Sequence, residues 1–226
     1  MSFTRKLVPL ACLAAIGAAS PASAAFVIYT DQAAFLAAIS APGTDTYDDL
    51  ATASLPGPIS RTAGAYAYTA AVGPNSPNLF PGRDGATDVF LSSNNRLDTI
   101  TLSGFASGVV GAGGLFFGSD IGGSPTSAAS ITVNFTDADG TVSRVVLNPT
   151  TASFLGAVSD SGLTGVSFLI GDQVGVWPSL DDLTLGAASG VVPEPATWAM
   201  MILGVGMVGG SLRASRRRGV ASHAAV

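Results

Sequence analysis

The chain has 226 residues, a formal net charge of −5 and a single cysteine. Between residues 25 and 190 it contains fourteen aspartates and four arginines but no lysine, histidine, cysteine or glutamate. An acidic segment of this kind is a poor candidate for binding nucleic acid, because that affinity rests on cationic contacts to phosphate. It also lacks the side chains of Ser-His-Asp triads, zinc centres and Schiff bases, so paired aspartates are the remaining catalytic option.

Residues 1–24 predict a secretory signal peptide. Two basic residues precede an apolar run over residues 7–19, and Ala22 and Ala24 supply the small side chains of a cleavage site. We expect signal peptidase to cut after Ala24. The lone Cys12 lies in the removed part, so the mature chain would have no disulfide.

The segment over residues 25–186 predicts an all-β domain, a β-sandwich with one short N-terminal helix. The helix is expected in "DQAAFLAAIS", residues 31–40, with Thr30 or Asp31 as its cap. Short β-like runs bounded by turn residues fill the rest and predict the strands: "FVIY", "AYAYTA", "TDVFLS", "RLDTITLSGF", "GGLFFGSD", "SITVNFT", "TVSRVVL", "GVSFLIG" and "DLTLG". Two Pro/Gly-rich stretches, residues 53–64 and 72–85, read as surface loops.

A hairpin is predicted between "SITVNFT" and "TVSRVVL". Asp137 and Asp139 have the D-x-D-G spacing that begins some calcium loops, but the bidentate glutamate that such a loop needs is absent. We therefore interpret these aspartates as turn residues.

Three aromatic residues are candidates for ligand binding. Tyr66 and Tyr68 fall on one face of a strand, and Trp177 is the only tryptophan before the carboxyl-terminal segment. Exposed rings of this kind can stack on sugars. The alternative is that they pack in the core of the sandwich.

The carboxyl-terminal segment has three parts after a linker at residues 187–192. The prolines of the Pro193–Glu194–Pro195 triplet disfavour helix and keep it extended. The uncharged run over residues 196–212 predicts a transmembrane helix, with Trp198 at its outer boundary. A buried core helix is the alternative. Arginines follow and would hold residues 219–226 in the cytoplasm: Arg213, Arg216, Arg217 and Arg218.

This order of triplet, tryptophan, apolar run and arginines resembles the PEP-CTERM sorting signal of Gram-negative bacteria, in its PEP-x-x-W-A-M-M variant. The resemblance covers residues 193–218. It implies recognition and removal of the signal by a membrane-embedded exosortase. It further implies export across the inner membrane, and delivery to the cell envelope, the outer surface or an exopolysaccharide matrix.

The order of strands also resembles the jelly-roll domains common in PEP-CTERM proteins, which are similar to carbohydrate-binding modules. That resemblance implies a polysaccharide partner. It also implies a structural calcium near the last strand, where Asp181 and Asp182 are the candidate ligands. The alternative reading is that one aspartate caps a turn and the other is solvated.

These observations predict an exported, exosortase-processed, non-catalytic protein of the envelope or matrix. Two alternatives remain at this point. One is a secreted glycoside hydrolase that uses only aspartates, and the other is a plain membrane-anchored surface protein.

Overall fold

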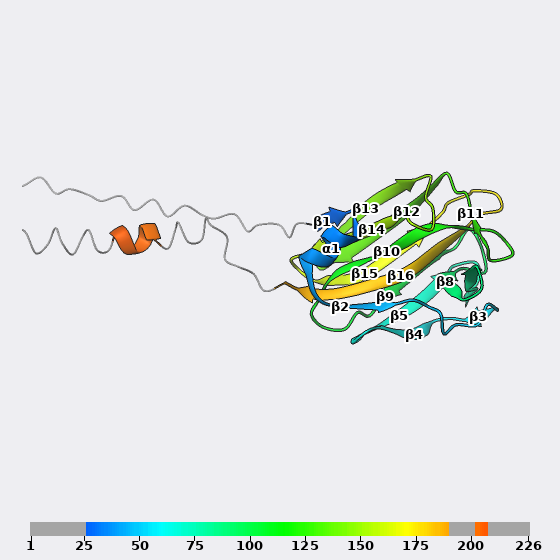
Figure 1. Ribbon diagram of the computed structural model, residues 1–226, viewed down its shortest axis with the longest axis horizontal. Helices are drawn as coiled ribbons and strands as arrows, with labels where there is room; N and C mark the ends of the chain where they lie inside the picture. Colours follow the sequence, from blue (N-terminus) through cyan, green and yellow to red (C-terminus); the bar gives the residue numbers. More distant parts are fainter. Residues whose placement is uncertain (1–25, 190–201, 208–226) are drawn as a thin grey trace, which may run out of the picture.

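A computed structural model describes residues 26–189 and 202–207. In the first range, β-strands form most of the structure, and one short helix lies on the outside of the sheets (Figure 1). The elements are β1 (Phe26–Tyr29), α1 (Gln32–Ala38), β2 (Ile39–Asp45), β3 (Leu55–Pro56), β4 (Ile59–Ala63), β5 (Tyr66–Gly73), β6 (Asn78–Leu79), β7 (Gly82–Asp84), β8 (Asp88–Ser92), β9 (Thr99–Ser103), β10 (Val109–Ser119), β11 (Pro125–Thr126), β12 (Ser130–Asp137), β13 (Thr141–Leu147), β14 (Phe154–Ser159), β15 (Leu163–Leu169) and β16 (Trp177–Ala188).

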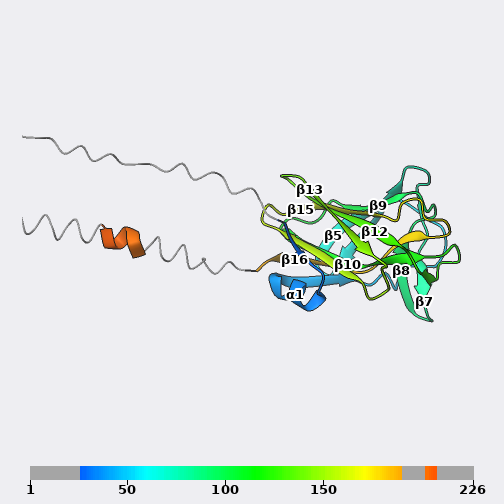
Figure 2. The same cartoon turned by 90° about the horizontal axis from the view of Figure 1, so that it is seen from above.

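Two antiparallel sheets form the two layers. One has the order β1-β14-β10-β16-β8-β7, with β2 also paired to β16 and β11 to β10. The other has the order β13-β12-β15-β9-β5-β4, and β3 pairs with β6 apart from both. Figure 2 shows the layers from above, with α1 lying against the first sheet.

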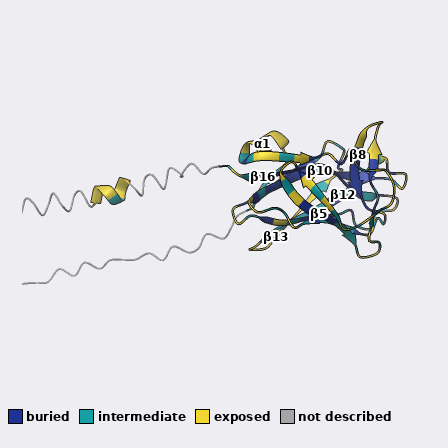
Figure 3. Cartoon of the chain, turned by 90° about the horizontal axis from the view of Figure 1, so that it is seen from below, coloured by how far each residue is buried: buried dark blue, intermediate teal, exposed yellow. Residues whose placement is uncertain are grey.

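The core lies between these layers. Alternate residues of β12 are buried, as the sequence pattern predicts. The rings of Phe116 on β10 and Phe168 on β15 meet edge to face at 5.3 Å between centroids, so the two sheets contact directly. In Figure 3 the buried residues run through the middle of the domain and the exposed ones cover α1 and the loops. The predicted all-β class is confirmed, and the arrangement is that of a β-sandwich.

Both ends of the domain lie at the same end of the sandwich. Phe26 of β1 pairs with Ser159 at the end of β14. The preceding residue of β14, Val158, pairs with Gly111 of β10, and Gly111 also pairs with Gly186 near the end of β16. Strand β16 is twelve residues long, at about 3.3 Å per residue. The start of β16 therefore lies at the end of the domain away from both termini.

Several sequence predictions of the elements were accurate. The helix has Asp31 as its cap, whose carboxylate accepts a hydrogen bond from the Ala34 amide at 2.7 Å. Its predicted end was wrong, because residues 39–45 form β2 along β16 instead. Strand β14 was not predicted. Strand β4 lies in a segment predicted as a loop, where prolines mask the alternating pattern.

The carboxyl boundary of the domain also differs. Strand β16 continues to Ala188, so the first two residues of the predicted linker belong to the sandwich. The expected signal peptide lies outside the described residues. So does most of the expected transmembrane helix, of which residues 202–207 are described and helical. Within the described parts of the chain, no helix has the length and apolar character needed to span a membrane.

Candidate functional site

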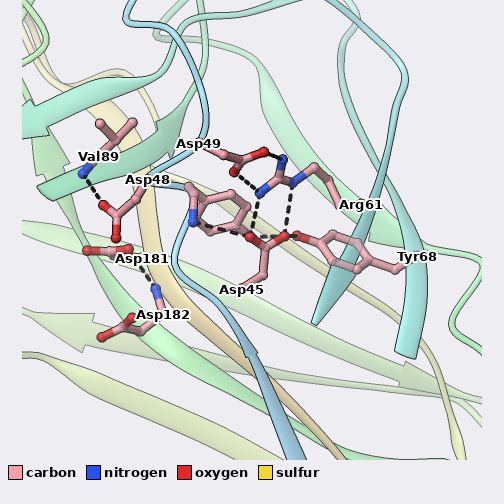
Figure 4. A network of polar contacts seen from close by, with 9 residues as sticks. Asp45, Asp48, Asp49, Arg61, Tyr68, Val89, Asp181 and Asp182 are labelled. Carbon is pink, nitrogen blue, oxygen red and sulfur yellow. Dashed lines mark hydrogen bonds and ion pairs between the residues drawn. The ribbon is translucent and has the colours of Figure 1, made fainter. Parts of the chain in front are cut away.

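A buried ionic cluster surrounds Arg61 on β4. Its guanidinium donates to both oxygens of Asp45, at 3.0 Å from Nε and 2.5 Å from Nη2, and to both oxygens of Asp49 at 2.8 and 2.7 Å. Tyr68 donates a further hydrogen bond of 2.6 Å to Asp45 (Figure 4). The guanidinium also lies 5.5 Å from the ring centroid of Tyr47. Every charged group of the Arg61 cluster thus has a partner of opposite charge.

The Arg61 cluster joins the two sheets. Asp45 ends β2 in one sheet, and Arg61 and Tyr68 pair across β4 and β5 in the other. A Cβ atom on Gly43 would lie 2.3 Å from the carbonyl oxygen of Ala63, so only glycine allows β2 to pass so close. This approach brings Asp45 within reach of Arg61.

The ionic state of this cluster is fixed by its contacts. Hydrogen bonds from Arg61 lower the pKa of Asp49 below its ordinary value. Burial raises the pKa of Tyr68 well above its ordinary value. An open groove of about 560 Å³ lies beside the cluster and is lined by hydroxyls such as Thr62 and Thr69. Both carboxylates at the groove accept hydrogen bonds from Arg61.

A second group of aspartates lies where the neighbour of β16 changes. The carboxyl-terminal part of β16 pairs with β2, and its amino-terminal part pairs with β8. The aspartate junction, which we define as Asp48, Asp88, Asp181 and Asp182, lies between them. Asp181 is 7% exposed, and Asp182 has a left-handed φ of 51° at a bulge in β16. In the described part of the chain, no arginine forms an ion pair with these four carboxylates.

The aspartate junction is electrostatically uncompensated. Burial, together with the nearby charges of Asp182 and Asp88, raises the pKa of Asp181 to about 7. Burial and the charges of Asp88 and Asp48 also raise the pKa of Asp182. The amide of Asp182 donates to Asp181 at 2.7 Å, and the amide of Val89 donates to Asp48 at 3.0 Å (Figure 4).

These carboxylates do not form a ready-made metal centre. No group of three or more His, Cys, Asp or Glu within the described ranges is arranged to hold a metal ion. Calcium takes six to eight oxygens, which backbone carbonyls and water can supply together with carboxylates. Asp181 and Asp182 also lie inside the last strand rather than before it. Calcium at these residues stays a prediction.

A smaller pocket holds Trp177, the first residue of β16. It has a volume of about 290 Å³ and is lined by residues from three chain segments besides β16: Phe80, Ser92, Ser93, Asn94, Ser119, Asp120, Ile121 and Gly123. Trp177 is half-buried and Ile121 is 83% exposed at the rim. We call this the Trp177 pocket. The sequence identified the tryptophan but missed its neighbours, because the pattern of a single segment does not reveal which loops meet.

The two tyrosines have structural contacts. Tyr68 is 2% exposed, so its ring is not accessible for stacking on a sugar, which corrects that expectation. Tyr66 packs partly against the core and donates from its hydroxyl to the Ala41 carbonyl at 3.0 Å. The core-packing alternative therefore describes Tyr68, and the structure does not bring Tyr66 or Tyr68 near Trp177 in the Trp177 pocket.

Asp137 and Asp139 form the predicted hairpin turn between β12 and β13. Asp137 accepts from the amides of Asp139 and Gly140 at 2.8 and 2.9 Å. Gly140 has a φ of 156°, within the range that favours glycine. Ser159 also donates to Asp137 at 2.5 Å, so this carboxylate serves the fold.

The fold and its carboxyl-terminal extension define an acidic β-sandwich domain followed by a short separate segment. That segment, residues 191–218, matches the PEP-CTERM protein-sorting motif. The match confirms the resemblance seen in the sequence and indicates an exported protein that is sorted to the cell envelope by an exosortase. The comparisons with curated proteins and with solved structures gave no match.

Proposed function

We propose that this is a non-catalytic protein of the cell envelope or exopolysaccharide matrix, processed by an exosortase, whose sandwich domain binds extracellular carbohydrate. The observation that carries the proposal is the sorting motif at residues 191–218, directly after a compact acidic domain that continues to residue 189. The Trp177 pocket, with its partly exposed aromatic ring, supports the carbohydrate-binding part.

The non-catalytic part of the proposal is supported by the state of the aspartates. A glycoside hydrolase needs two carboxyl groups facing one cleft, about 5–10 Å apart. At the open groove, Asp45 and Asp49 are both bound to Arg61. Asp120 is the one carboxylate among the residues that line the Trp177 pocket. An aspartate-only hydrolase is therefore less well supported.

The sorting part is tested with three changes to the carboxyl-terminal segment, in a host with and without its exosortase. Glu194→Ala combined with Pro195→Ala alters the triplet but keeps the apolar run and its charges. We expect this variant to stay uncut and to remain in the inner membrane. Deleting residues 196–226 should instead give an exported domain that bypasses processing. Size and fractionation distinguish these forms.

The arginines provide the matched control. Replacing Arg213, Arg216, Arg217 and Arg218 by serine leaves the triplet intact and should weaken retention of the carboxyl end in the cytoplasm. If the unaltered protein keeps residues 191–218 in a host that has the enzyme, it is a plain anchored surface protein and the proposal is wrong. Co-fractionation of the processed protein with exopolysaccharide tests the matrix role.

A further inference from the structure

The Trp177 pocket lies at the end of the sandwich opposite to Ala188, the last residue of β16. Trp177 pairs with Ser119 at one end of the β10–β16 ladder, and Ala187 pairs with Val109 at the other. Because β16 leads from Ala188 to the sorting motif, any attachment through the carboxyl end leaves the Trp177 pocket facing away from the attachment point. A ligand-binding site at this end is therefore accessible to molecules outside the envelope.

One wall of the Trp177 pocket is apolar and accessible. Trp177 and Phe80 are both half-buried, and Ile121, in the loop over residues 120–124, is 83% exposed. The loop is held in place by Asp120, which accepts from the amides of Gly122 and Ser124 at 2.8 and 3.0 Å. An aromatic ring on an ordered wall is suited to the apolar face of a sugar ring.

The floor of the Trp177 pocket is made of buried serines whose protons are already used. Ser179 donates to Ser119 at 2.9 Å, and Ser92 donates to the Pro178 carbonyl at 2.9 Å. The hydroxyl oxygens of Ser92 and Ser119 lie 3.2 Å apart. Because the Ser92 hydroxyl proton is already donated to the Pro178 carbonyl, Ser119 is the donor of this second contact. The hydroxyl oxygens of the floor retain lone pairs but have no proton to offer a ligand.

The charge of the Trp177 pocket also favours a ligand that donates hydrogen bonds. The carboxylate of Asp120 accepts hydrogen bonds and, when ionised, donates none. None of the residues that line the pocket is Lys, Arg or His. Asn94 and the indole N–H of Trp177 can donate to a ligand, but the serine floor and Asp120 only accept, so the pocket favours a ligand that donates hydrogen bonds and carries no negative charge.

From these observations we infer that the Trp177 pocket binds one neutral sugar residue, at a chain end or on a branch of a polysaccharide, and discriminates against uronic acids. This inference rests on the proposed function and names the ligand class of its carbohydrate site. The volume of about 290 Å³ is at the small end of ligand pockets, at about 300–1,000 Å³, which limits the site to a single ring. Sugar hydroxyls supply the donors that the floor lacks.

The experiment is a calorimetric titration of the full-length protein in detergent with the methyl glycosides of glucose, galactose, mannose and glucuronic acid. We expect at least one neutral glycoside to bind and the glucuronide to bind at least about tenfold more weakly. Trp177→Ala should weaken the neutral glycoside at least about tenfold, a typical effect of removing an aromatic anchor. Its fold is checked by circular dichroism.

A second variant covers the case in which Trp177→Ala does not fold. Ile121→Lys changes an exposed rim residue and adds a positive charge, so it should reduce the discrimination against the glucuronide at least threefold. Val27→Lys makes the same change on β1, at the opposite end of the domain, where Val27 is 50% exposed. This control should leave the discrimination unchanged.

The inference is overturned if no neutral glycoside binds, if the glucuronide binds as tightly, or if Ile121→Lys and Val27→Lys have equal effects. These failures differ from failure of the proposed function. A protein that co-fractionates with exopolysaccharide equally well with and without Trp177 keeps its matrix role and loses only this site. A protein that never reaches the envelope or matrix contradicts the proposed function itself.

Discussion

Two groups of aspartates lie within one region of this domain, and they differ in whether an arginine pairs with them. In the Arg61 cluster, the guanidinium lies between two carboxylates and donates to both. Its hydrogen bonds lower the pKa of Asp49. The aspartate junction has no arginine partner among the described residues, and the pKa of Asp181 rises to about 7. Asp45 and Asp181 are both buried, but among the described residues a guanidinium contacts only Asp45.

Removing the Arg61 guanidinium should leave both groups of aspartates without a cation, and it should have the largest effect on the free energy of unfolding. Arg61→Met leaves Asp45 buried without its partner, so we expect the free energy of unfolding to fall by about 3–5 kcal/mol in urea denaturation. Arg96→Met is the matched control. Arg96 pairs at 2.5 Å with Asp172, whose side chain is 77% exposed, and its loss should cost less than about 1 kcal/mol. Equal losses for the two variants would mean that the buried pairing adds nothing.

The pH dependence of stability tests the raised pKa of Asp181 in the aspartate junction. The pKa of Asp181 is higher in the folded protein than its ordinary value of 3.8, so its stabilising contribution is complete at low pH and is lost as the pH rises through about 7. Between pH 5 and pH 8 we expect a loss on the order of 2 kcal/mol. The pKa of Asp49 is lowered, so its opposite contribution changes only below about pH 4.

Asp181→Asn identifies the residue responsible. The amide side chain keeps an acceptor for the Asp182 amide but cannot ionise, so this variant should be more stable than the parent at pH 8 and lose most of the slope between pH 5 and pH 8. Thermal melts at both values measure it. An unchanged slope would assign the pH dependence to other groups.

Bound calcium would supply the positive charge that the aspartate junction lacks. If Asp181 or Asp182 binds it, free calcium at about ten times its dissociation constant should stabilise the protein by roughly 1.4 kcal/mol, because a ligand of the folded state alone raises stability. Melting temperatures with calcium and with chelator at pH 8 test this, and Asp181→Asn is the control. Identical midpoints for the parent would remove the metal prediction.

The smallest effect is expected inside the Arg61 cluster. Asp49 has a side chain that is 69% exposed, whereas that of Asp45 is 4% exposed. Asp49→Asn should therefore cost less than about 1 kcal/mol in urea denaturation. A loss comparable to that of Arg61→Met would show that the outer carboxylate is as important as the buried one.

Local patterns predicted much of the fold. The alternation in "SITVNFT" and the D-A-D-G turn each depend on neighbouring residues, and each was predicted correctly. The helix cap was predicted at Thr30 or Asp31, and it is Asp31. The sorting motif is likewise a linear pattern. Strand β2 was missed because "ISAPGTD" has no clear alternation and is a strand only through its pairing with β16.

The sites depend on contacts between distant segments, which no local pattern encodes. Arg61 and Asp45 are sixteen residues apart and lie in different sheets. Trp177 and Phe80 come from distant parts of the chain and share one pocket. Tyr68 appeared to be a binding residue because the spacing of "AYAY" places both rings on one face, but spacing alone does not say whether that face is inside or outside.

The length of β16 has a mechanical consequence. One strand joins the Trp177 pocket at its first residue to the sorting motif beyond its last, and it is hydrogen-bonded to β10 along most of that length. A pull between a bound polysaccharide and an anchored carboxyl end would run along this strand and load its ladder in shear. Because both points of attachment lie on this one strand, its covalent backbone would carry most of that tension, and the hydrogen bonds would not open one after another.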